Sequence, residues 1–198
     1  MNIRPFGADH VLVELEDPQQ ALAVYEEARR RQVRAASIVP AASTVLFEGL
    51  RDVDSLVRSL PGWDVTSVHV AGGAVEVPTT YDGDDLDQVA RLWEMSRDEV
   101  VATHTSTEFV VAFCGFAPGF AYCSGLPDDL AVPRLDSPRT TVPAGSVGLA
   151  GAYTGVYPTS SPGGWQLIGR TELVLWDVDR DPPATLVPGT RVRFTEAP

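Results

Sequence analysis

Residues 115–169 hold glycine and proline at a high density, and this limits the possible folds more than any other feature of the chain. Seventeen of these 55 residues are Gly or Pro, a fraction that is typical of disorder when the rest of a segment is polar and repetitive. Aromatic side chains are interleaved with them here, at Phe116, Phe120, Tyr122, Tyr153, Tyr157 and Trp165. Short strands joined by tight turns fit both observations. The segment therefore predicts a small β-barrel or β-sandwich.

Strand patterns on both sides extend this all-β region to residues 107–198. Residues 107–114 are rich in β-branched and aromatic side chains, which favours a strand. Residues 171–177 and 190–195 predict closing strands, and Pro188-Gly189 between them predicts a turn.

Residues 1–80 predict a separate α+β domain. Its expected strands are 11–15, 33–39, 44–48 and one within 65–77, and its expected helices are 18–31 and 52–60. Pro18 suits the first turn of a helix, and Pro61-Gly62 ends the second helix. The order β-α-β-β-α-β is that of a ferredoxin-like domain.

Residues 81–106 predict two helices that bridge the two domains. Residues 84–93 carry apolar side chains at helical spacing. Ser96 and Glu99 form a capping box at the start of the second helix, which reaches about residue 105. Aspartates before and within the first helix lack the spacing of a calcium-binding EF-hand, so we interpret them as helix caps.

Composition restricts the classes of partner. The net charge of −12 and the pI of about 4.5 repel phosphate backbones, so we expect no nucleic-acid partner. No apolar run approaches the ~20 residues that a membrane helix needs, and the N-terminus lacks the apolar core of a secretion signal. Only two cysteines occur, which favours a reduced, cytoplasmic protein over a disulfide scaffold.

All fifteen basic residues are arginine. A GC-rich genome produces the same bias, but the chemical consequence holds in either case. Without lysine the chain cannot build a P-loop, a Schiff base or a biotinyl-lysine. Any anion that it binds must be held by arginine, by backbone N–H groups or by a helix N-terminus.

Two arginines are candidate anion-binding residues. Arg134 and Arg139 each follow a proline, which stiffens the backbone and suits a bidentate contact with a carboxylate or phosphate. Arg139 is also the only charge in residues 137–169, so this stretch is covered by the barrel itself, by a ligand or by another protein. The alternative role for both arginines is a structural ion pair with Asp128, Asp129 or Asp136.

Two further places in the sequence each leave two interpretations open. Ala144-Gly145-Ser146-Val147-Gly148 is similar to a nucleophile elbow, but Ala replaces its first Gly, which leaves either backbone donors at Gly145 for a ligand or a plain strand turn. His104, at the end of a predicted helix, is either an acid/base residue or a packed core histidine. His10 and His69 show no metal-ligand spacing, so no metal site is expected.

Three long motifs carry a family resemblance. They are Gly115-Phe116-Ala117-Pro118-Gly119-Phe120-Ala121-Tyr122, then Pro138-Arg139-Thr140-Thr141-Val142-Pro143-Ala144-Gly145-Ser146-Val147, then Ser161-Pro162-Gly163-Gly164-Trp165-Gln166-Leu167-Ile168-Gly169-Arg170-Thr171. In this order they resemble the family named variously allophanate hydrolase subunit 1, KipI and the 5-oxoprolinase B subunit (PxpB). The resemblance covers nearly the whole chain.

The resemblance implies a small α+β domain followed by a cyclophilin-like β-barrel. It implies a KipA-like protein, the C subunit, as partner, together with a third subunit, in the ATP-dependent opening of 5-oxoproline to L-glutamate. ATP, with magnesium, would be used by the assembled complex, with no tightly bound cofactor on this chain. Two alternatives remain: half of a biotin-dependent carboxyltransferase that acts on urea, and a non-catalytic inhibitor of a histidine kinase.

The family motifs also imply site residues. His104 is the candidate acid/base, and Arg134 and Arg139 are the candidates that balance phosphate charge. The expected substrate-binding residues are Gly145, Ser146, Tyr157, Gly163, Gly164, Trp165 and Gln166. The chain departs from the family pattern at Phe109, Cys123 and Tyr153, where Tyr, Leu and Gln are usual, and the last change leaves the substrate open.

Overall fold

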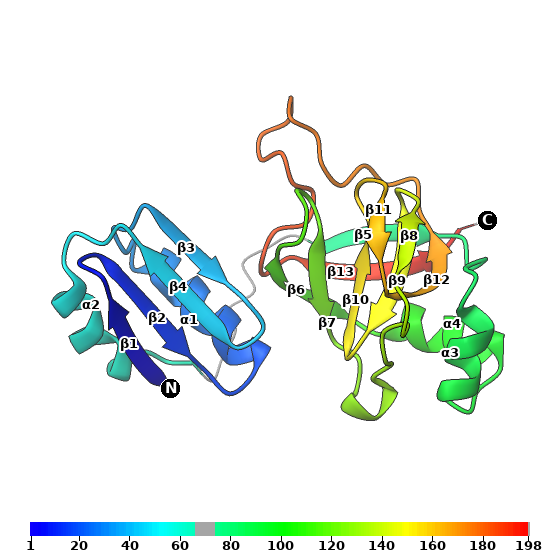
Figure 1. The fold of residues 1–198 in the computed structure, drawn as a ribbon, viewed down its shortest axis with the longest axis horizontal. Coiled ribbons are helices and arrows are strands. Elements are labelled where there is room, and N and C mark those ends of the chain that lie inside the picture. The colour runs from blue at the N-terminus through cyan, green and yellow to red at the C-terminus, as the bar shows by residue number, and fades with distance from the viewer. Residues whose placement is uncertain (66–73, 198) are drawn as a thin grey trace. The chain divides into compact units, whose positions relative to one another are not determined.

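The computed structural model describes residues 1–65 and 74–197 (Figure 1). The chain divides into two compact units, Met1–Ala71 and Gly72–Pro198.

A four-stranded antiparallel sheet forms the first unit within the described residues, in the order β1-β2-β4-β3. Its elements are β1 (Asn2–Phe6), β2 (His10–Glu14), α1 (Pro18–Arg30), β3 (Ser37–Pro40), β4 (Thr44–Glu48), α2 (Val53–Ser59) and the 3-10 turn η1 (Leu60–Gly62). Side chains alternate between buried and half-buried along β2 and β4. The buried ones, Val11, Val13, Val45 and Phe47, pack with Ala21, Val24 and Ala28 of α1.

This unit has the ferredoxin-like arrangement, except that the N-terminal strand β1 takes the place expected for the last strand. β2, α1 and β3 form a split β-α-β unit, because β4 lies between β2 and β3 and is antiparallel to both. The outer position beside β2 is taken by the N-terminal β1. The last strand that the sequence predicts within 65–77 falls partly on residues 66–73, which lie outside the described residues, and residue 74 starts a strand of the other unit. The sequence did not indicate β1 because only Ile3 turns partly inward.

The second unit is a nearly closed barrel flanked by two helices (Figure 1). Its elements are β5 (Ala74–Thr79), α3 (Leu86–Leu92), α4 (Arg97–Ser106), β6 (Phe109–Cys114), β7 (Ala121–Ser124), η2 (Asp128–Leu130), β8 (Arg139–Val142), β9 (Ser146–Ala150), β10 (Tyr153–Val156), β11 (Ser161–Gly163), β12 (Gln166–Arg170) and β13 (Arg191–Glu196). Seven strands of the described chain form one sheet, in the order β12-β9-β10-β7-β6-β13-β5, and β8 pairs with β11 separately.

Two backbone hydrogen bonds bring the ends of the seven-stranded sheet together. The amide of Thr80, just after β5, donates to Arg170 of β12 at 2.8 Å, and the amide of Arg170 donates back at 2.9 Å. β5 itself runs parallel to β13. The expected α+β domain followed by an all-β barrel is therefore confirmed, with the barrel taking its first strand from residues 74–79.

The helices expected to bridge the domains pack on the barrel. α3 contacts β12, and α4 contacts both α3 and β13. The capping box at the start of α4 is present, since Ser96 and Glu99 each accept the other's backbone amide. The N-cap residue of α3, Asp85, makes no capping bond with its side chain, so the interpretation of the aspartates as caps is wrong at this position.

The stretch 171–177 is not a closing strand. Only Trp176 pairs there, as a single bridge to Ala184, in an arm whose apolar side chains Val174, Trp176 and Val178 are exposed. Their alternation imitates a strand, but no neighbouring strand covers them in the part of the chain that the structure describes. The expected strand 190–195 is β13.

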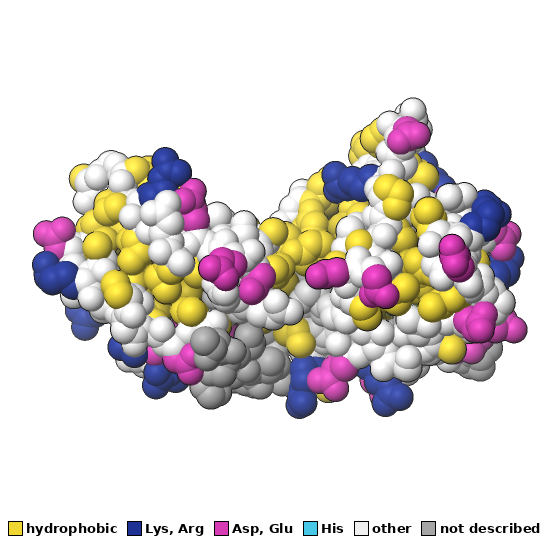
Figure 2. Space-filling view, turned by 90° about the horizontal axis from the view of Figure 1, so that it is seen from below, with side chains coloured by type: hydrophobic (Ala, Val, Ile, Leu, Met, Phe, Trp, Pro, Cys, Tyr) yellow, Lys and Arg dark blue, Asp and Glu magenta, His cyan; other side chains and the backbone are white. Residues whose placement is uncertain are grey.

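Figure 2 shows one face of the surface, on which charges of both signs are mixed. On the face in Figure 2, arginines are scattered among acidic side chains and do not form a basic patch. None of the described helices is long and apolar enough to cross a membrane.

Candidate functional site

An aromatic pocket of about 210 Å³ lies in the second unit. It is lined by Phe116, Phe120, Tyr122, Arg134, Leu135, Pro138, Tyr157, Pro162, Gly163, Gly164 and Trp165. Phe120 lies in its wall, with its ring edge-on to those of Tyr157 and Trp165 at 5.3 Å each. Tyr157 and Trp165 are buried. Their burial shows that the barrel itself covers much of the charge-poor stretch 137–169.

A tight loop places Phe116 beside this pocket. Phe116 has φ of 70° and Gly119 has φ of 82°, and the amide of Phe120 donates to Ala117 at 3.0 Å. A left-handed backbone is costly for a bulky residue. Phe116 is 63% exposed, while its ring meets Phe120 edge-on at 5.3 Å. The loop therefore holds an exposed aromatic ring in a conformation that its backbone alone disfavours.

Two glycines shape the pocket in different ways. A Cβ on Gly163 would collide with the ring and hydroxyl of Tyr157, so this position needs glycine for close packing. A Cβ on Gly164 would meet nothing nearer than Pro138, at 3.7 Å. The carbonyl of Gly164 accepts the amide of Leu135 at 2.8 Å, which ties residues 133–136 to the pocket.

Arg134 brings an available positive charge to the pocket. Its side chain is exposed, and within residues 1–65 and 74–197 it forms no ion pair or side-chain hydrogen bond. Burial raises the pKa of Tyr157, and the nearby Arg134 guanidinium opposes that rise. Tyr157 thus keeps its proton at neutral pH, so the pocket offers a phenol hydroxyl and a guanidinium group to a ligand.

Arg139 is placed differently. Its Nη2 donates to Oδ1 of Asp85 at 2.8 Å, and Nη1 donates to the carbonyl of Trp165 at 3.5 Å. The structural ion pair, the alternative to an anion-binding role, is present, but its partner is Asp85 and not one of the three aspartates expected from the sequence. Two of the five guanidinium N–H donors are used in these contacts, and the side chain is partly exposed.

His104 lies in the barrel core and not among the residues that line the aromatic pocket. Its Nδ1 lies 2.7 Å from the Tyr81 hydroxyl and its Nε2 lies 2.9 Å from Thr154 Oγ1. Thr154 Oγ1 donates to the carbonyl of Gly148 at 3.3 Å, so it accepts from Nε2–H and Nδ1 accepts from Tyr81. Burial lowers the pKa of His104 to about 3. The ring is therefore neutral at pH 7, in the packed position that was the alternative to an acid/base role.

Gly145 and Ser146 serve the barrel. Gly145, with φ of 81°, donates its amide to Tyr157 and accepts the amide of Thr171, both at 2.8 Å. Its backbone groups are thus already bonded within the protein, as expected for a strand turn. Ser146 is buried at the start of β9, and its carbonyl accepts the amide of Tyr157 at 2.9 Å.

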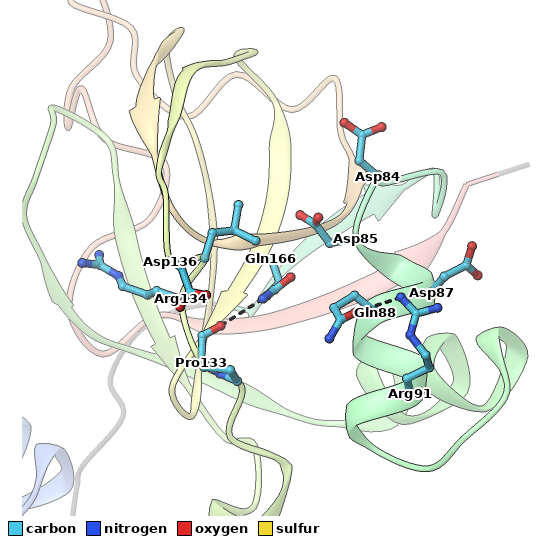
Figure 3. A pocket seen from close by; sticks show the side chains of 10 residues that line it. Asp84, Asp85, Asp87, Gln88, Arg91, Pro133, Arg134, Asp136 and Gln166 are labelled. Atoms are coloured by element: carbon cyan, nitrogen blue, oxygen red, sulfur yellow. Dashed lines mark hydrogen bonds between the residues drawn. The ribbon is translucent and has the colours of Figure 1, made fainter.

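Gln166 lines a second cavity, of about 570 Å³, which shares Arg134 and Leu135 with the aromatic pocket. Figure 3 shows residues 84–91 along one side of it and residues 133–136 along the other. The structure thus brings Arg134, Tyr157, Gly163, Gly164 and Trp165 together in one pocket and places Gln166 next to it.

Other residues that line the two cavities were not predicted from the sequence to be site residues, although a signal for some of them exists. Phe116, Phe120 and Tyr122 belong to the first family motif, but motif membership alone does not show which ring faces a cavity. Asp84, Asp85 and Asp87 line the second cavity. Their position at the start of a predicted helix favours a capping role, so the sequence does not indicate that they face a cavity.

The described residues contain no group of three or more carboxylate, histidine or cysteine side chains that could hold a metal ion. The sequence has no lysine for a P-loop.

Comparison with known proteins decides the family. The model of the carboxyltransferase domain, subdomain C and D, matches residues 1–186. The chain is 37% identical over 206 residues to the 5-oxoprolinase B subunit of Haemophilus influenzae, covering 98% of this chain and 97% of that protein. The chain therefore belongs to the family of the 5-oxoprolinase B subunit.

Further relatives carry the same name or the same fold. The 5-oxoprolinase B subunit of Bacillus subtilis is 50% identical over 123 residues, which cover 61% of this chain and about half, 51%, of that protein. The solved structure of TTHA0988 is 33% identical with a TM-score of 0.81, covering 96% of this chain but only 40% of that one. PH0987 from Pyrococcus horikoshii is 32% identical with a TM-score of 0.60, covering 98% of this chain and 97% of that one.

A more distant relative carries a different name. The urea amidolyase of Saccharomyces cerevisiae is 33% identical over 97 residues, which cover 47% of this chain and 5% of that protein.

Proposed function

We propose that this chain is a subunit of an enzyme assembly that opens a small cyclic amide, with 5-oxoproline to L-glutamate as the reaction. Relatives named as the B subunit of 5-oxoprolinase support this substrate. The observation that carries the proposal is the Arg134 guanidinium, unpaired within the described residues, beside a small aromatic pocket.

The pocket fits the two ends of such a substrate. A flat lactam ring packs against the aromatic walls of Phe120 and Trp165, and its carboxylate pairs with Arg134 in a bidentate contact. The protonated hydroxyl of Tyr157 donates to the amide oxygen. In this proposal the chain binds and orients the substrate, which raises the rate by fixing the reacting geometry.

The assembly supplies the rest. We propose a KipA-like C subunit and a third subunit as partners, with ATP and magnesium consumed by the assembled complex. The word subunit in the relatives' names supports such an assembly. A cytoplasmic location follows from this metabolic role, and both cysteines are free.

The proposal is tested by co-expressing this chain with the two partner subunits and measuring ATP hydrolysis that depends on 5-oxoproline. We expect Arg134→Gln to raise KM at least tenfold, because the substrate carboxylate loses its partner. Arg58→Gln is the matched control, since Arg58 is an exposed arginine of the first unit. Equal KM values for the two variants would contradict the role of Arg134.

A carboxyltransferase that acts on urea is the second candidate. The urea amidolyase match favours it. That reaction needs a separate biotinylated protein, because this chain has no lysine to carry biotin. Turnover of urea with carboxybiotin, without turnover of 5-oxoproline, would select it.

A further inference from the structure

The hydroxyl of Tyr122 is an unused hydrogen-bonding group of the aromatic pocket. Tyr122 lies on β7 and lines the pocket, but its hydroxyl makes no hydrogen bond within the described chain. This oxygen is not one of the buried side-chain atoms that lack a partner there, so a ligand can reach it. A phenol that keeps its proton can donate one hydrogen bond and accept another.

Four aromatic neighbours hold the ring of Tyr122 in place. The ring stacks on Phe113, with the centroids 4.3 Å apart and the planes at 17°. It meets the rings of Tyr153 and Trp165 edge-on, at 6.0 Å and 5.5 Å, and it packs against Phe120 at 5.0 Å. A side chain that is already held by packing loses little further freedom when a ligand binds. The Tyr122 hydroxyl is therefore a preorganised contact for a ligand in the pocket.

Tyr122 lies near both polar groups that the proposed function assigns to the substrate. Burial raises the pKa of Tyr122, and the nearby Arg134 guanidinium opposes that rise. Burial also raises the pKa of Tyr157, which responds to Arg134 and to Tyr122 as well. Both phenols thus keep their protons at neutral pH. Among the described residues that line the pocket, Arg134 is the only charged one, so the charge of the pocket suits an anion.

The ring N–H of 5-oxoproline needs an acceptor between these two groups. In that ring the N–H lies between the carbonyl group, which Tyr157 binds in the proposed function, and the carbon that carries the carboxylate, which Arg134 binds. Among the described side chains that line the pocket, only the two tyrosines have an acceptor atom, since arginine and tryptophan only donate. The Tyr157 oxygen already accepts from the backbone of Trp165. Tyr122 therefore provides the free acceptor.

We propose that Tyr122 binds the lactam N–H and so determines the preference of the pocket for lactams over ring compounds that lack this group. The inference rests on the proposed function. The Tyr122 hydroxyl accepts from the N–H while the Tyr157 hydroxyl donates to the carbonyl oxygen, so the two phenols match the donor and the acceptor of one cis amide. A site that hydrogen-bonds an N–H disfavours an analogue without it, because the acceptor loses its partner.

The test compares two ligands of the assembled complex by calorimetric titration without ATP. One is 5-oxoproline, and the other is the matching enantiomer of 3-oxocyclopentanecarboxylate, which has a methylene group in place of the N–H. We expect the wild type to bind 5-oxoproline about tenfold more tightly, the effect of one hydrogen bond. In Tyr122→Phe this ratio should fall close to one, with the affinity for the ketone unchanged. Tyr153→Phe is the control, because it removes a hydroxyl from the same aromatic cluster but outside the pocket lining, and it should keep the wild-type ratio.

The thermal stability of Tyr122→Phe should match that of the wild type, because the hydroxyl has no partner in the described chain. Equal wild-type affinities for the two ligands, or a ratio that Tyr122→Phe leaves unchanged, would overturn this inference alone. The proposed function is measured separately, as ATP hydrolysis that depends on 5-oxoproline. Discrimination that depends on Tyr122 but comes without turnover would contradict the proposed function alone, and no binding of 5-oxoproline would overturn both.

Discussion

Asp85 and Arg139 lie 54 positions apart in the sequence, yet Oδ1 of Asp85 accepts from Nη2 of Arg139 at 2.8 Å. The other oxygen, Oδ2, accepts the backbone amide of Leu167 at 2.6 Å. Asp85 is 8% exposed. One buried carboxylate therefore joins the start of α3 to β8 and β12.

Arg139→Ala should lower the free energy of unfolding by about 2–3 kcal/mol, because it leaves a buried carboxylate without its counter-charge. This is below the range for fully buried pairs, since Arg139 is partly exposed. Urea denaturation measures the loss. Arg97→Ala, which removes the exposed pair with Asp87, should cost less than about 1 kcal/mol. Full stability with lost turnover would instead support the anion-binding role expected from the sequence.

His104 should make the protein acid-sensitive. Its pKa is about 3 in the folded protein and about 6.5 in the unfolded chain, so the unfolded chain binds the extra proton between these values. The contribution of His104 to stability is therefore constant above pH 6.5, and it falls as the pH drops toward 3, by up to about 1.4 kcal/mol per pH unit.

His104→Gln tests this titration. The variant should be less stable at pH 7, because it disrupts the Tyr81–His104–Thr154 hydrogen bonds, but it should lack this part of the pH dependence. Urea denaturation at several pH values between 7 and 4 gives both results. Parallel pH profiles for the two proteins would show that His104 does not titrate as its burial requires.

Gly163→Ala should distort the aromatic pocket. The new Cβ would lie 2.8 Å from ring atoms of Tyr157, and such overpacking typically costs about 1–3 kcal/mol. Gly164→Ala is the neighbouring control, since its Cβ has room. Thermal unfolding and the affinity for 5-oxoproline should change for the first variant and stay near wild type for the second.

Phe116 offers a test of backbone strain. Glycine adopts the left-handed φ of 70° without the cost that alanine pays, so Phe116→Gly should be about 1 kcal/mol more stable than Phe116→Ala. Denaturant unfolding of the two variants measures this difference. Equal stabilities would mean that the loop relaxes when the ring is removed.

Local patterns predicted much of the fold, because caps and turns depend on neighbouring residues. The capping box at Ser96 and the strand 190–195 are examples. Long-range pairing could not be predicted from local patterns. The residues next to Asp85 and Arg139 do not indicate that these two side chains form an ion pair. Residues 74–77 are compatible with a strand in either sheet, so their pairing with β13 depends on tertiary contacts. Likewise, the aromatic spacing of Tyr157 and Trp165 does not tell which way the rings face.

The parallel pairing of β5 with β13 determines where the chain can be cut. A fragment that begins at residue 81, after the domain boundary expected from the sequence, would lose β5 and the backbone bonds of Thr80 to β12. Two unpaired strand edges would then face solvent, and exposed edges of this kind recruit other chains. A fragment that begins at residue 72 keeps every described strand of the barrel, so a few residues at the junction decide whether these two strand edges are paired or exposed.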